Sequence, residues 1–386
     1  MWVTTLQAAV AGLYLGAVPA PGTWNWNLFE LEGRDYVSVD QVAEFYRLPQ
    51  PARSGDSVKL GTGDKGVELW VSRKEAVVNG VRFSLCFPVT EHRGQPMLSR
   101  KDLVKVFEPL MRPERIPFGK AFKTVVIDAG HGGGDRGARS RWSTEEAQLT
   151  LSVAKRLRPL LEAAGFKVVM TRIRDEFKEL ADRAAVAENY ENSIFVSLHF
   201  NSGDSAARGV ETYALAPAGS PSTASERLRM SDFQSFAGNA NDGNNVLLAA
   251  AVHRRMSQLW GNAKLDRGVK RARFVVLYQC KRPSILIEGG FVSNPEDGKL
   301  ISNPDFQLRM AEHIKLGILD YQSLLNEGVQ YEPGMMIVMN REAEAVEVPM
   351  VETSPTAMIP RGGLPITTVA IGTNILDVTP FRPVDF

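Results

Sequence analysis

The chain has few cysteines and almost no net charge, and both shortages exclude classes of protein. Its 386 residues include two cysteines, Cys86 and Cys280, which lie far apart and fit neither a disulfide framework nor a Cys-x-x-Cys metal site. We therefore expect two buried thiols. A formal net charge of +1 provides no global field that would favour nucleic acid as a partner.

Long hydrophobic runs are also scarce. After residue 20 no segment is long and apolar enough to predict a transmembrane helix. Residues 6–20 are apolar and small, but no Lys or Arg precedes them, and the first basic residue is Arg34. Residues 1–23 are therefore either an atypical leader segment or a buried N-terminal strand, and the sequence leaves both open.

The rest of the chain divides into four parts by composition and pattern. Residues 24–112 predict a small α+β module, and proline-bearing residues 113–121 predict a linker. Residues 122–325 predict a larger domain with a core of its own. Residues 326–386 have no sustained period and form a C-terminal extension that is either disordered or a strand-like strap.

A strand-then-helix unit occurs twice in the module. The segment Tyr36–Phe45 is echoed by Met97–Phe107, which is evidence for a duplicated unit. Between them, Asn79-Gly80 is a hairpin signal. The module resembles the small repeat domains of the copper-amine-oxidase N-terminal type that often precede cell-wall enzymes. This resemblance implies a spacer or wall-binding role and no catalytic residues.

The larger domain alternates between short apolar runs and helical patterns. Such alternation predicts an α/β fold with a mainly parallel twisted sheet and helices on both faces, as in many hydrolases. The long helix expected after residue 146 ends at Gly165, where glycine terminates the apolar stripe. The expected strands comprise residues 125–128, 167–171, 194–198, 209–213, 274–277 and 284–287.

Four residues with metal or acid–base chemistry lie where these strands end or the next helix begins. They are His131, Glu146, His199 and Glu288. Because the carboxyl ends of parallel strands share one edge of a sheet, we expect the four side chains to converge. Three ligands and a nearby base are what a catalytic zinc site requires.

Each of these residues has a simpler interpretation when it is taken alone. A histidine after glycine is commonly a turn residue, and His199 could be a satisfied core histidine. The glycine-rich segment around His131 could also cradle a phosphate, but it lacks the Gly-Lys-Ser/Thr ending of a P-loop and the Gly-x-Gly-x-x-Gly spacing. Glu288 is hardest to explain structurally, since a carboxylate that ends a buried strand needs a partner.

Residues 123–324 resemble the zinc-dependent N-acetylmuramoyl-L-alanine amidases of the cell-wall type called amidase 3. The order and spacing of seven segments carry the resemblance. These are Val126–Gly133, Glu146–Leu157, Lys167–Arg172, Phe195–Asn201, Arg208–Glu211, Arg267–Lys270 and Leu286–Glu296. The sequence departs from the family pattern at Gly289-Gly290 and at Phe200, and both departures predict a reshaped substrate groove.

The resemblance implies that His131, Glu146 and His199 bind Zn²⁺ and that Glu288 is the catalytic carboxylate. Glu145 is the rival for the second ligand, and the register of the following helix favours Glu146. The implied activity is hydrolysis of the amide between N-acetylmuramic acid and L-alanine of the stem peptide. The alternative is a catalytically silent peptidoglycan-binding protein on the same scaffold.

Further residues are candidates for substrate binding or support. Asn201 either positions substrate or has a structural role in its loop, and Asp128 either orients a histidine or closes a turn. Nine lysines and arginines lie between residues 253 and 282, against one acid. This run is either a solvated basic face or a surface that attracts stem-peptide carboxylates through Arg267, Lys270 and Arg271.

The segment 217–245 is longer and more polar than a simple connection requires. We expect either a flexible flap near the substrate groove or a disordered insertion. The implied substrate, peptidoglycan, predicts a periplasmic or secreted protein of the bacterial envelope. Partners expected from the resemblance are muramyl peptides and an activator or cell-division protein, with no nucleic acid.

Overall fold

The computed structural model describes residues 23–62, 66–116, 122–140, 144–225, 227–326 and, as a backbone strand, 336–341. All of these belong to one compact unit. The predictions for the leader, for the second half of the linker and for most of the C-terminal extension therefore lie outside the described residues.

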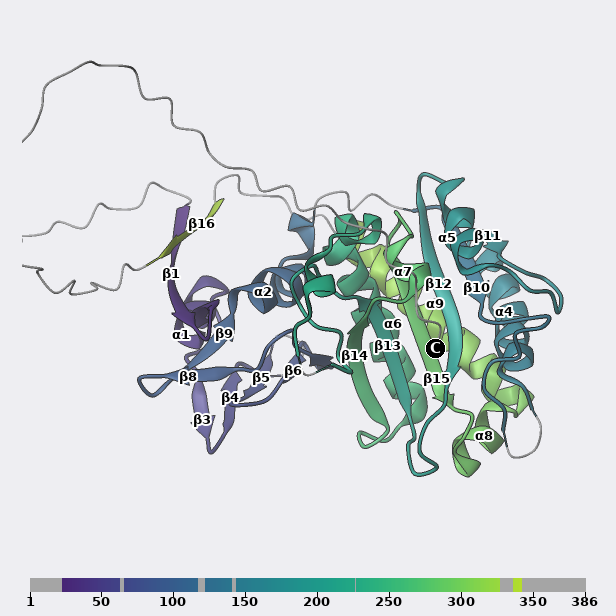
Figure 1. Ribbon diagram of the computed structural model, residues 1–386, viewed down its shortest axis with the longest axis horizontal. Helices are drawn as coiled ribbons and strands as arrows, with labels where there is room; N and C mark the ends of the chain where they lie inside the picture. The colour runs from purple at the N-terminus through teal and green to yellow at the C-terminus, as the bar shows by residue number, and fades with distance from the viewer. Residues whose placement is uncertain are drawn as a thin grey trace, which may run out of the picture. The chain divides into compact units, whose positions relative to one another are not determined.

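A six-stranded layer of parallel and antiparallel pairs forms the centre of the larger domain (Figure 1). Four strands run parallel, and one pair of strands runs in the opposite direction beside them. The mainly parallel sheet is thus confirmed, with one antiparallel junction added. In spatial order the strands are β11 (Lys167–Met170), β10 (Thr124–Ala129), β12 (Ser193–Asn201), β15 (Ser284–Phe291), β13 (Val210–Leu215) and β14 (Asp266–Ala272).

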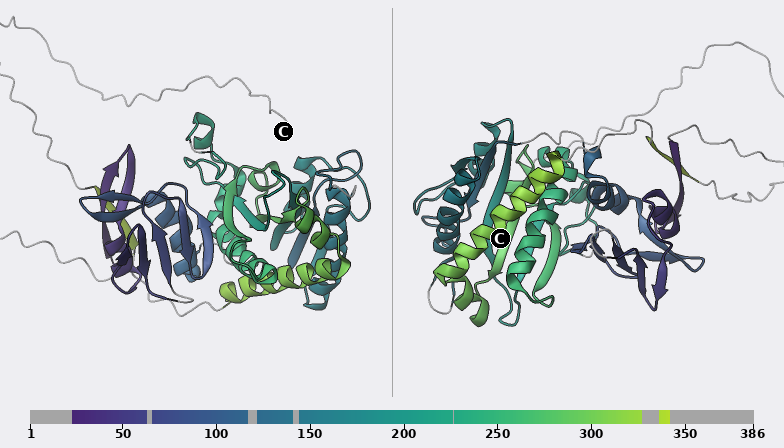
Figure 2. Two further views of the ribbon diagram at one scale, coloured as in Figure 1. Left: turned by 90° about the horizontal axis from the view of Figure 1, so that it is seen from below. Right: turned by 180° about the vertical axis from the view of Figure 1, so that it is seen from behind.

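Helices cover both faces of this layer, as predicted. In β10, Val125 and Ile127 belong to the main core, whereas Val126 belongs to a second, smaller core on the other face. This alternation follows from the two-residue period of a strand. The main core is covered by α4 (Glu146–Ala163), α6 (Asp242–Trp260) and α9 (Pro304–Asn326), and the second by α5 (Leu180–Glu188) and α7 (Val275–Tyr278) (Figure 2).

In the helix α4, the apolar residues that predicted the helix form its buried face. Leu149, Val153, Leu157 and Leu161 recur every four residues and are all buried. One continuous apolar stripe therefore faces the sheet. The helix ends just before Gly165, whose φ of +91° suits glycine, as the sequence predicted.

The predicted strand-then-helix repeat is present in the module. In both copies a serine ends the strand and caps the helix: Ser38 Oγ accepts from the Gln41 amide at 3.3 Å and Ser99 Oγ from the Asp102 amide at 3.0 Å. The two strands pair antiparallel. The copies are β2 (Arg34–Ser38) with α1 (Val39–Phe45), and β9 (Gln95–Ser99) with α2 (Arg100–Asp102), the π-helical turn Leu103–Phe107 and α3 (Glu108–Met111).

A meander of short strands connects the module to the large sheet. Its last strand, β7 (Val81–Ser84), pairs with β14 through Phe83 and Val269, so the sheet continues into the module. Asn79 and Gly80, with φ of 51° and 76°, form the predicted hairpin turn. The other strands are β3 (Ala52–Ser54), β4 (Ser57–Leu60), β5 (Val67–Trp70) and β6 (Glu75–Val78).

Two further strands lie at the margins of the second sheet of the module. One is β8 (Thr90–His92), which pairs with β9. The other is β16 (Met336–Arg341), which pairs in parallel with β1 (Thr23–Leu31). This part of the C-terminal extension is therefore a strand. The remaining helix of the larger domain, α8 (Pro295–Ile301), directly follows β15.

The strand predicted at residues 274–277 is wrong, because Val275–Tyr278 form the helix α7. The amides of Tyr278 and Gln279 donate to the carbonyls four residues earlier at 2.9 and 3.1 Å. A short apolar run carries no period that separates strand from helix. Here Val276 and Leu277 pack into the smaller core, and the neighbouring strand is β14, which ends at Ala272.

The close packing of α9 on α6 yields a stability prediction. A Cβ at Gly317 would lie 2.5 Å from the Val252 Cα, a backbone atom that cannot rotate away. We expect Gly317→Val to lower the free energy of unfolding by about 1–3 kcal/mol through overpacking. Leu316→Val, at the exposed neighbouring position, should change it by no more than about 0.5 kcal/mol. Chemical denaturation of the full chain measures both, and equal effects would contradict the packing argument.

Candidate metal centre

Three of the four predicted residues meet at the carboxyl edge of the sheet. His131 follows β10, Glu146 begins α4 and His199 lies near the end of β12. Each offers one ligand atom, and these atoms all lie within 4.8 Å of one another. Glu146 Oε1 is 3.1 Å from His131 Nε2 and 3.0 Å from His199 Nδ1. The arrangement can hold a metal ion.

Glu146 is a buried carboxylate that stays ionised. The backbone amides of Ala138 and Phe200 donate to its two oxygens at 2.9 and 3.0 Å. Burial opposes the charged form, but hydrogen bonds and charges of His131 and His199 outweigh it and hold the pKa of Glu146 well below its usual value. The charge that a cation requires is therefore present at neutral pH.

Asp135 sets the orientation of the first histidine. Both its carboxylate oxygens lie 2.8 Å from His131 Nδ1. Burial would lower the pKa of His131, but contacts with Glu146 and Asp135 raise it above the usual value. A proton held on Nδ1 leaves the Nε2 lone pair directed at Glu146. Sequence reasoning missed Asp135, although an acid four residues after His131 in a glycine-rich turn was an available signal.

Asp128 does not orient a histidine, so that expectation is wrong. It is fully buried and accepts hydrogen bonds from Thr171, Ser197 and Arg183 at 2.6, 2.7 and 3.0 Å. Arg183 also donates to the carbonyls of Ala129 and His131. The ion pair therefore fixes the backbone on which His131 lies.

A second buried arginine, Arg172, holds the same loop from the side of α4. It donates to the carbonyls of Gly130 and Ala147 at 2.8 and 2.7 Å. Neither Arg172 nor Arg183 was predicted as a supporting residue. Their partners are mostly main-chain carbonyls distant in sequence, which leave no signature in the residue pattern.

The structure distinguishes between Glu146 and Glu145, the two candidates for the second ligand. Glu145 is in extended conformation before α4, and its Oε2 lies 2.9 Å from Arg136 Nη1. It points to a surface arginine, whereas Glu146 points to the two histidines.

Glu288 lies on the strand next to His199. The two residues are paired across β12 and β15, and Glu211 of β13 is paired with Glu288 from the other side. The buried Oε2 of Glu288 has no hydrogen-bond partner among the described residues. Burial, with the charges of Glu146 and Glu211, raises the pKa of Glu288 well above its usual value, and Lys270 partly opposes this. A buried carboxylate oxygen without a partner among the described residues thus lies on the strand beside His199.

The residues predicted to bind substrate divide into two groups. Arg267 and Lys270 both form ion pairs with Glu211, and the Asn201 side-chain amide donates to the same carboxylate at 3.3 Å. These side chains lie at the edge that carries Glu288. Arg271 does not, because adjacent strand residues point to opposite faces; it is buried and donates to the Lys105 carbonyl at 3.1 Å.

Comparison with known proteins identifies a family. Residues 125–320 match the family model described as N-acetylmuramoyl-L-alanine amidase. The chain belongs to this family. Among curated relatives, the amidase AmiC of Escherichia coli O6:H1 is 33% identical over 217 residues, which cover 51% of this chain and 52% of AmiC. The uncharacterised protein YqiI of Bacillus subtilis is 34% identical over 52% of this chain and 84% of its own length.

A solved structure matches a similar share of this chain. The catalytic domain of CwlV, an amidase from Bacillus (Paenibacillus) polymyxa, is 33% identical, with a TM-score of 0.43 over 52% of this chain and 99% of that domain. The chain spans about half the length of AmiC. Among the residues that the structure describes, no helix has the length and hydropathy needed to span a bilayer.

The segment 217–245 is neither a flap over the metal centre nor, where described, a disordered insertion. It follows β13, which runs antiparallel to β15, and therefore leaves the sheet at the edge opposite Glu288. Asn241 donates to the Lys281 carbonyl at 2.9 Å, just before β15 begins. In Figure 1, α7 marks this edge and α8 the edge that carries the metal centre. The direction of β13 determines at which edge of the sheet the segment lies. The residue pattern of the sequence does not show this direction.

The buried ion pair beneath His131 gives a second stability prediction. Asp128→Ala leaves the Arg183 charge buried without its partner, which should lower the free energy of unfolding by about 3–5 kcal/mol. Arg158→Ala, which breaks the exposed Arg158–Glu162 pair on α4, should cost no more than about 0.5 kcal/mol. Equilibrium denaturation compares the variants. A loss of less than about 1 kcal/mol for Asp128→Ala would show that the pair does not hold the loop.

Two glycines, Gly130 and Gly137, make room for the three ligand side chains. A Cβ at Gly130 would lie 2.4 Å from the His199 ring, and one at Gly137 would lie 2.6 Å from Glu146 Oε2. A Cβ at Gly134, by contrast, meets nothing within 4 Å. We expect Gly130→Ala to displace the His199 ring and weaken binding of a divalent metal ion by about 10–100-fold. Gly134→Ala should bind the ion as the unmodified chain does. Competition with a zinc-chelating dye measures both affinities, and an unchanged affinity in Gly130→Ala would contradict the geometry.

Proposed function

We propose that this chain hydrolyses peptidoglycan at the amide between N-acetylmuramic acid and L-alanine of the stem peptide. The observation that carries the proposal is the unsatisfied carboxylate of Glu288 beside the His131–Glu146–His199 group. Membership of the amidase family supports the same reaction. A bound Zn²⁺ and Glu288 would together provide the acid–base chemistry that an unreactive amide requires.

The residues present fit Zn²⁺. Two imidazole nitrogens and one carboxylate oxygen form a ligand set used by catalytic zinc sites. Tetrahedral ligands with bonds of about 2.0–2.1 Å lie about 3.4 Å from one another. The carboxylate oxygen here is 3.0 and 3.1 Å from the two nitrogens, a separation that small side-chain adjustments bring to the expected value. We propose His131, Glu146 and His199 as the ligands.

When bound, Zn²⁺ lowers the pKa of a coordinated water and polarises the substrate carbonyl. Glu288 accepts the proton of the attacking water and then donates it to the departing amine of L-alanine. Asp135 keeps the His131 proton on Nδ1 throughout. The Asp128–Arg183 pair holds the His131 backbone in place while the charge around it changes.

Arg267 and Asn201 are proposed to position the substrate. The Arg267 side chain is about one-third exposed, pairs with Glu211 and lies over the Phe291 ring at 4.9 Å. Its remaining donors can bind a stem-peptide carboxylate. Asn201 lies at the end of β12 and shares Glu211 with Arg267, so it supports the same side of the site.

The substrate places the reaction outside the cytoplasm, in the bacterial envelope. We propose a periplasmic or secreted location on this ground. An activator or cell-division protein as partner stays a prediction from the family resemblance.

Digestion of purified peptidoglycan tests the proposed function. The zinc-loaded chain should release free stem peptides with a new L-alanine amino terminus, and a chelator should abolish the release. Glu288→Gln should retain Zn²⁺ and reduce the rate by about 10²–10⁴-fold, because the proton carrier is lost. The matched control Glu145→Gln should remain active, since Glu145 faces Arg136.

Other outcomes of the digestion would contradict the proposed function or its mechanism. Tight binding of peptidoglycan without release of stem peptide would replace the amidase by a silent wall-binding protein. Release that persists in excess chelator, or full activity of Glu288→Gln, would overturn the mechanism.

A further inference from the structure

The segment 173–180 exposes a large share of the apolar side chains found at the surface. It connects β11 to α5 and includes the first residue of α5. Ile173, Phe177 and Leu180 are exposed by 59%, 51% and 49%. Nine large apolar side chains are exposed among the described residues, so these eight positions hold a third of them. Such a concentration of exposed apolar groups indicates a binding surface.

The segment lies beside the metal centre. Because β11 runs parallel to β10, the chain leaves both strands at the edge where His131 lies. The Gly133 amide donates to Asp175 Oδ1 at 2.7 Å. A Cβ at Gly133 would lie 2.6 Å from the Phe177 nitrogen and 3.1 Å from the Phe177 Cβ. The phenyl side chain therefore starts next to the glycine-rich loop that carries His131.

Two buried arginines hold the segment in place. Arg172 donates to the Arg174 carbonyl at 3.2 Å, and Arg183 donates to the Lys178 carbonyl at 3.0 Å. The same two guanidinium groups donate to carbonyls of the loop that carries His131. The segment and this loop are thus fixed to each other, and a ligand would meet the exposed side chains without first having to order their backbone.

The charges of the segment disfavour an anionic ligand. Arg174 Nε lies 3.0 Å from Glu176 Oε2, so these two charges balance each other. Asp175 and Glu179 then outnumber Lys178. A small excess of negative charge repels a ligand that carries carboxylates. An uncharged ligand with apolar faces suits the segment.

The order of the strands gives the substrate a direction across the site. Starting from β11 the strands follow as β10, β12, β15, β13 and β14, so β11 and β14 lie on opposite sides of the metal centre (Figure 1). In the proposed reaction Glu288 of β15 donates to the departing amine, and Arg267 of β14 binds a carboxylate of the stem peptide. The stem peptide then extends toward β14. The acyl side of the amide, which carries the sugar, points toward β11.

We propose that the segment 173–180 is the carbohydrate subsite of this metal centre, where Phe177 packs on the sugar next to the scissile amide. One face of a sugar ring carries C–H groups, which are attracted to the face of an aromatic ring. Once its lactyl carboxyl forms the amide, N-acetylmuramic acid is uncharged, and its methyl groups suit Ile173 and Leu180. The inference rests on the proposed function, which supplies the identity of the polymer.

A protein partner fits the segment less well. A stable protein interface uses about 20–30 residues on each side, whereas three apolar side chains are exposed here within eight positions. The segment also touches the loop of His131, so a ligand bound to it lies close to the scissile bond. Both observations favour a part of the substrate.

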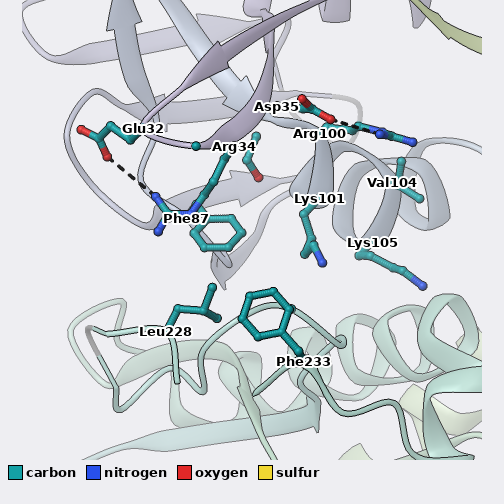
Figure 3. Close-up of a pocket in the computed structure, with 13 residues that line it drawn as sticks. Glu32, Arg34, Asp35, Phe87, Arg100, Lys101, Val104, Lys105, Leu228 and Phe233 are labelled. Carbon is teal, nitrogen blue, oxygen red and sulfur yellow. Dashed lines mark hydrogen bonds and ion pairs between the residues drawn. The ribbon is translucent and has the colours of Figure 1, made fainter. Parts of the chain in front are cut away.

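Phe233 provides a matched control, since its phenyl side chain is also more than half exposed. It belongs to segment 217–245, which leaves the sheet at the edge opposite Glu288. It lines the pocket in Figure 3, where the cations already have partners. Arg34 lies 3.8 Å from Glu32, and Arg100 lies 3.1 Å from Asp35. Phe233 is therefore remote from the metal centre, and nothing around it calls for a sugar.

Cleavage of two substrates that share the scissile amide tests the inference. One is N-acetylglucosaminyl-N-acetylmuramoyl-tetrapeptide, and the other is the same tetrapeptide with only a lactyl group on its L-alanine. The zinc-loaded full chain should prefer the disaccharide substrate. Phe177→Ala should lower the ratio of the two kcat/KM values about tenfold. Phe177→Tyr, which keeps the ring, and Phe233→Ala should both preserve the ratio.

An unchanged ratio in Phe177→Ala would leave the exposed side chains to a protein partner and would overturn the inference. A ratio lowered equally by Phe233→Ala, or no preference for the disaccharide in the unmodified chain, would overturn it as well. Cleavage of both substrates with an unchanged ratio would leave the proposed function intact.

If neither substrate is cleaved, binding decides. Calorimetric titration of the uncharged N-acetylglucosamine tetramer into the chelator-treated full chain should show saturable binding that Phe177→Ala weakens about tenfold. Such binding without cleavage would support the subsite and refute the proposed reaction. The absence of binding, or binding that Phe177→Ala leaves unchanged, would overturn the inference.

Discussion

The structure depends on keeping one buried carboxylate charged between two imidazoles. Glu146 has to lose its water, remain ionised and lie within about 3 Å of two imidazole nitrogens, one from the loop after β10 and one from β12. Backbone amides of Ala138 and Phe200 satisfy its oxygens, and two glycines leave the space that its partners need. Below this group, Arg172 and Arg183 fix the loop of His131 by binding its carbonyls. The local structure is thus arranged around a single charge.

Much of this could be predicted from the sequence because strand ends leave a clear pattern. Apolar runs followed by His131, His199 and Glu288 placed three residues at one sheet edge, and the stripe of α4 placed Glu146 there as well. The supporting residues could not be predicted, since Arg183 binds a partner 55 positions away and two carbonyls. The place of segment 217–245 depends on the direction of β13. The helical turn of α7 depends on its packing against α5. Both are tertiary effects.

The continuity of the sheet connects the module with the larger domain. Because β7 extends the sheet beyond β14, the module lies beside the edge at which segment 217–233 leaves β13. Asp102 and Asp232 then fix the backbone of the two segments that meet on that side.

The nitrogen chemical shifts of the five histidines, measured by NMR with and without Zn²⁺, test the metal centre most directly. The geometry predicts that His131 binds through Nε2 and keeps its Nδ1 proton on Asp135, whereas His199 binds through Nδ1. The resonances of His92, His253 and His313 should not move. Coordination of both histidines through the same ring nitrogen, or a metal-induced shift confined to the other three, would contradict the account.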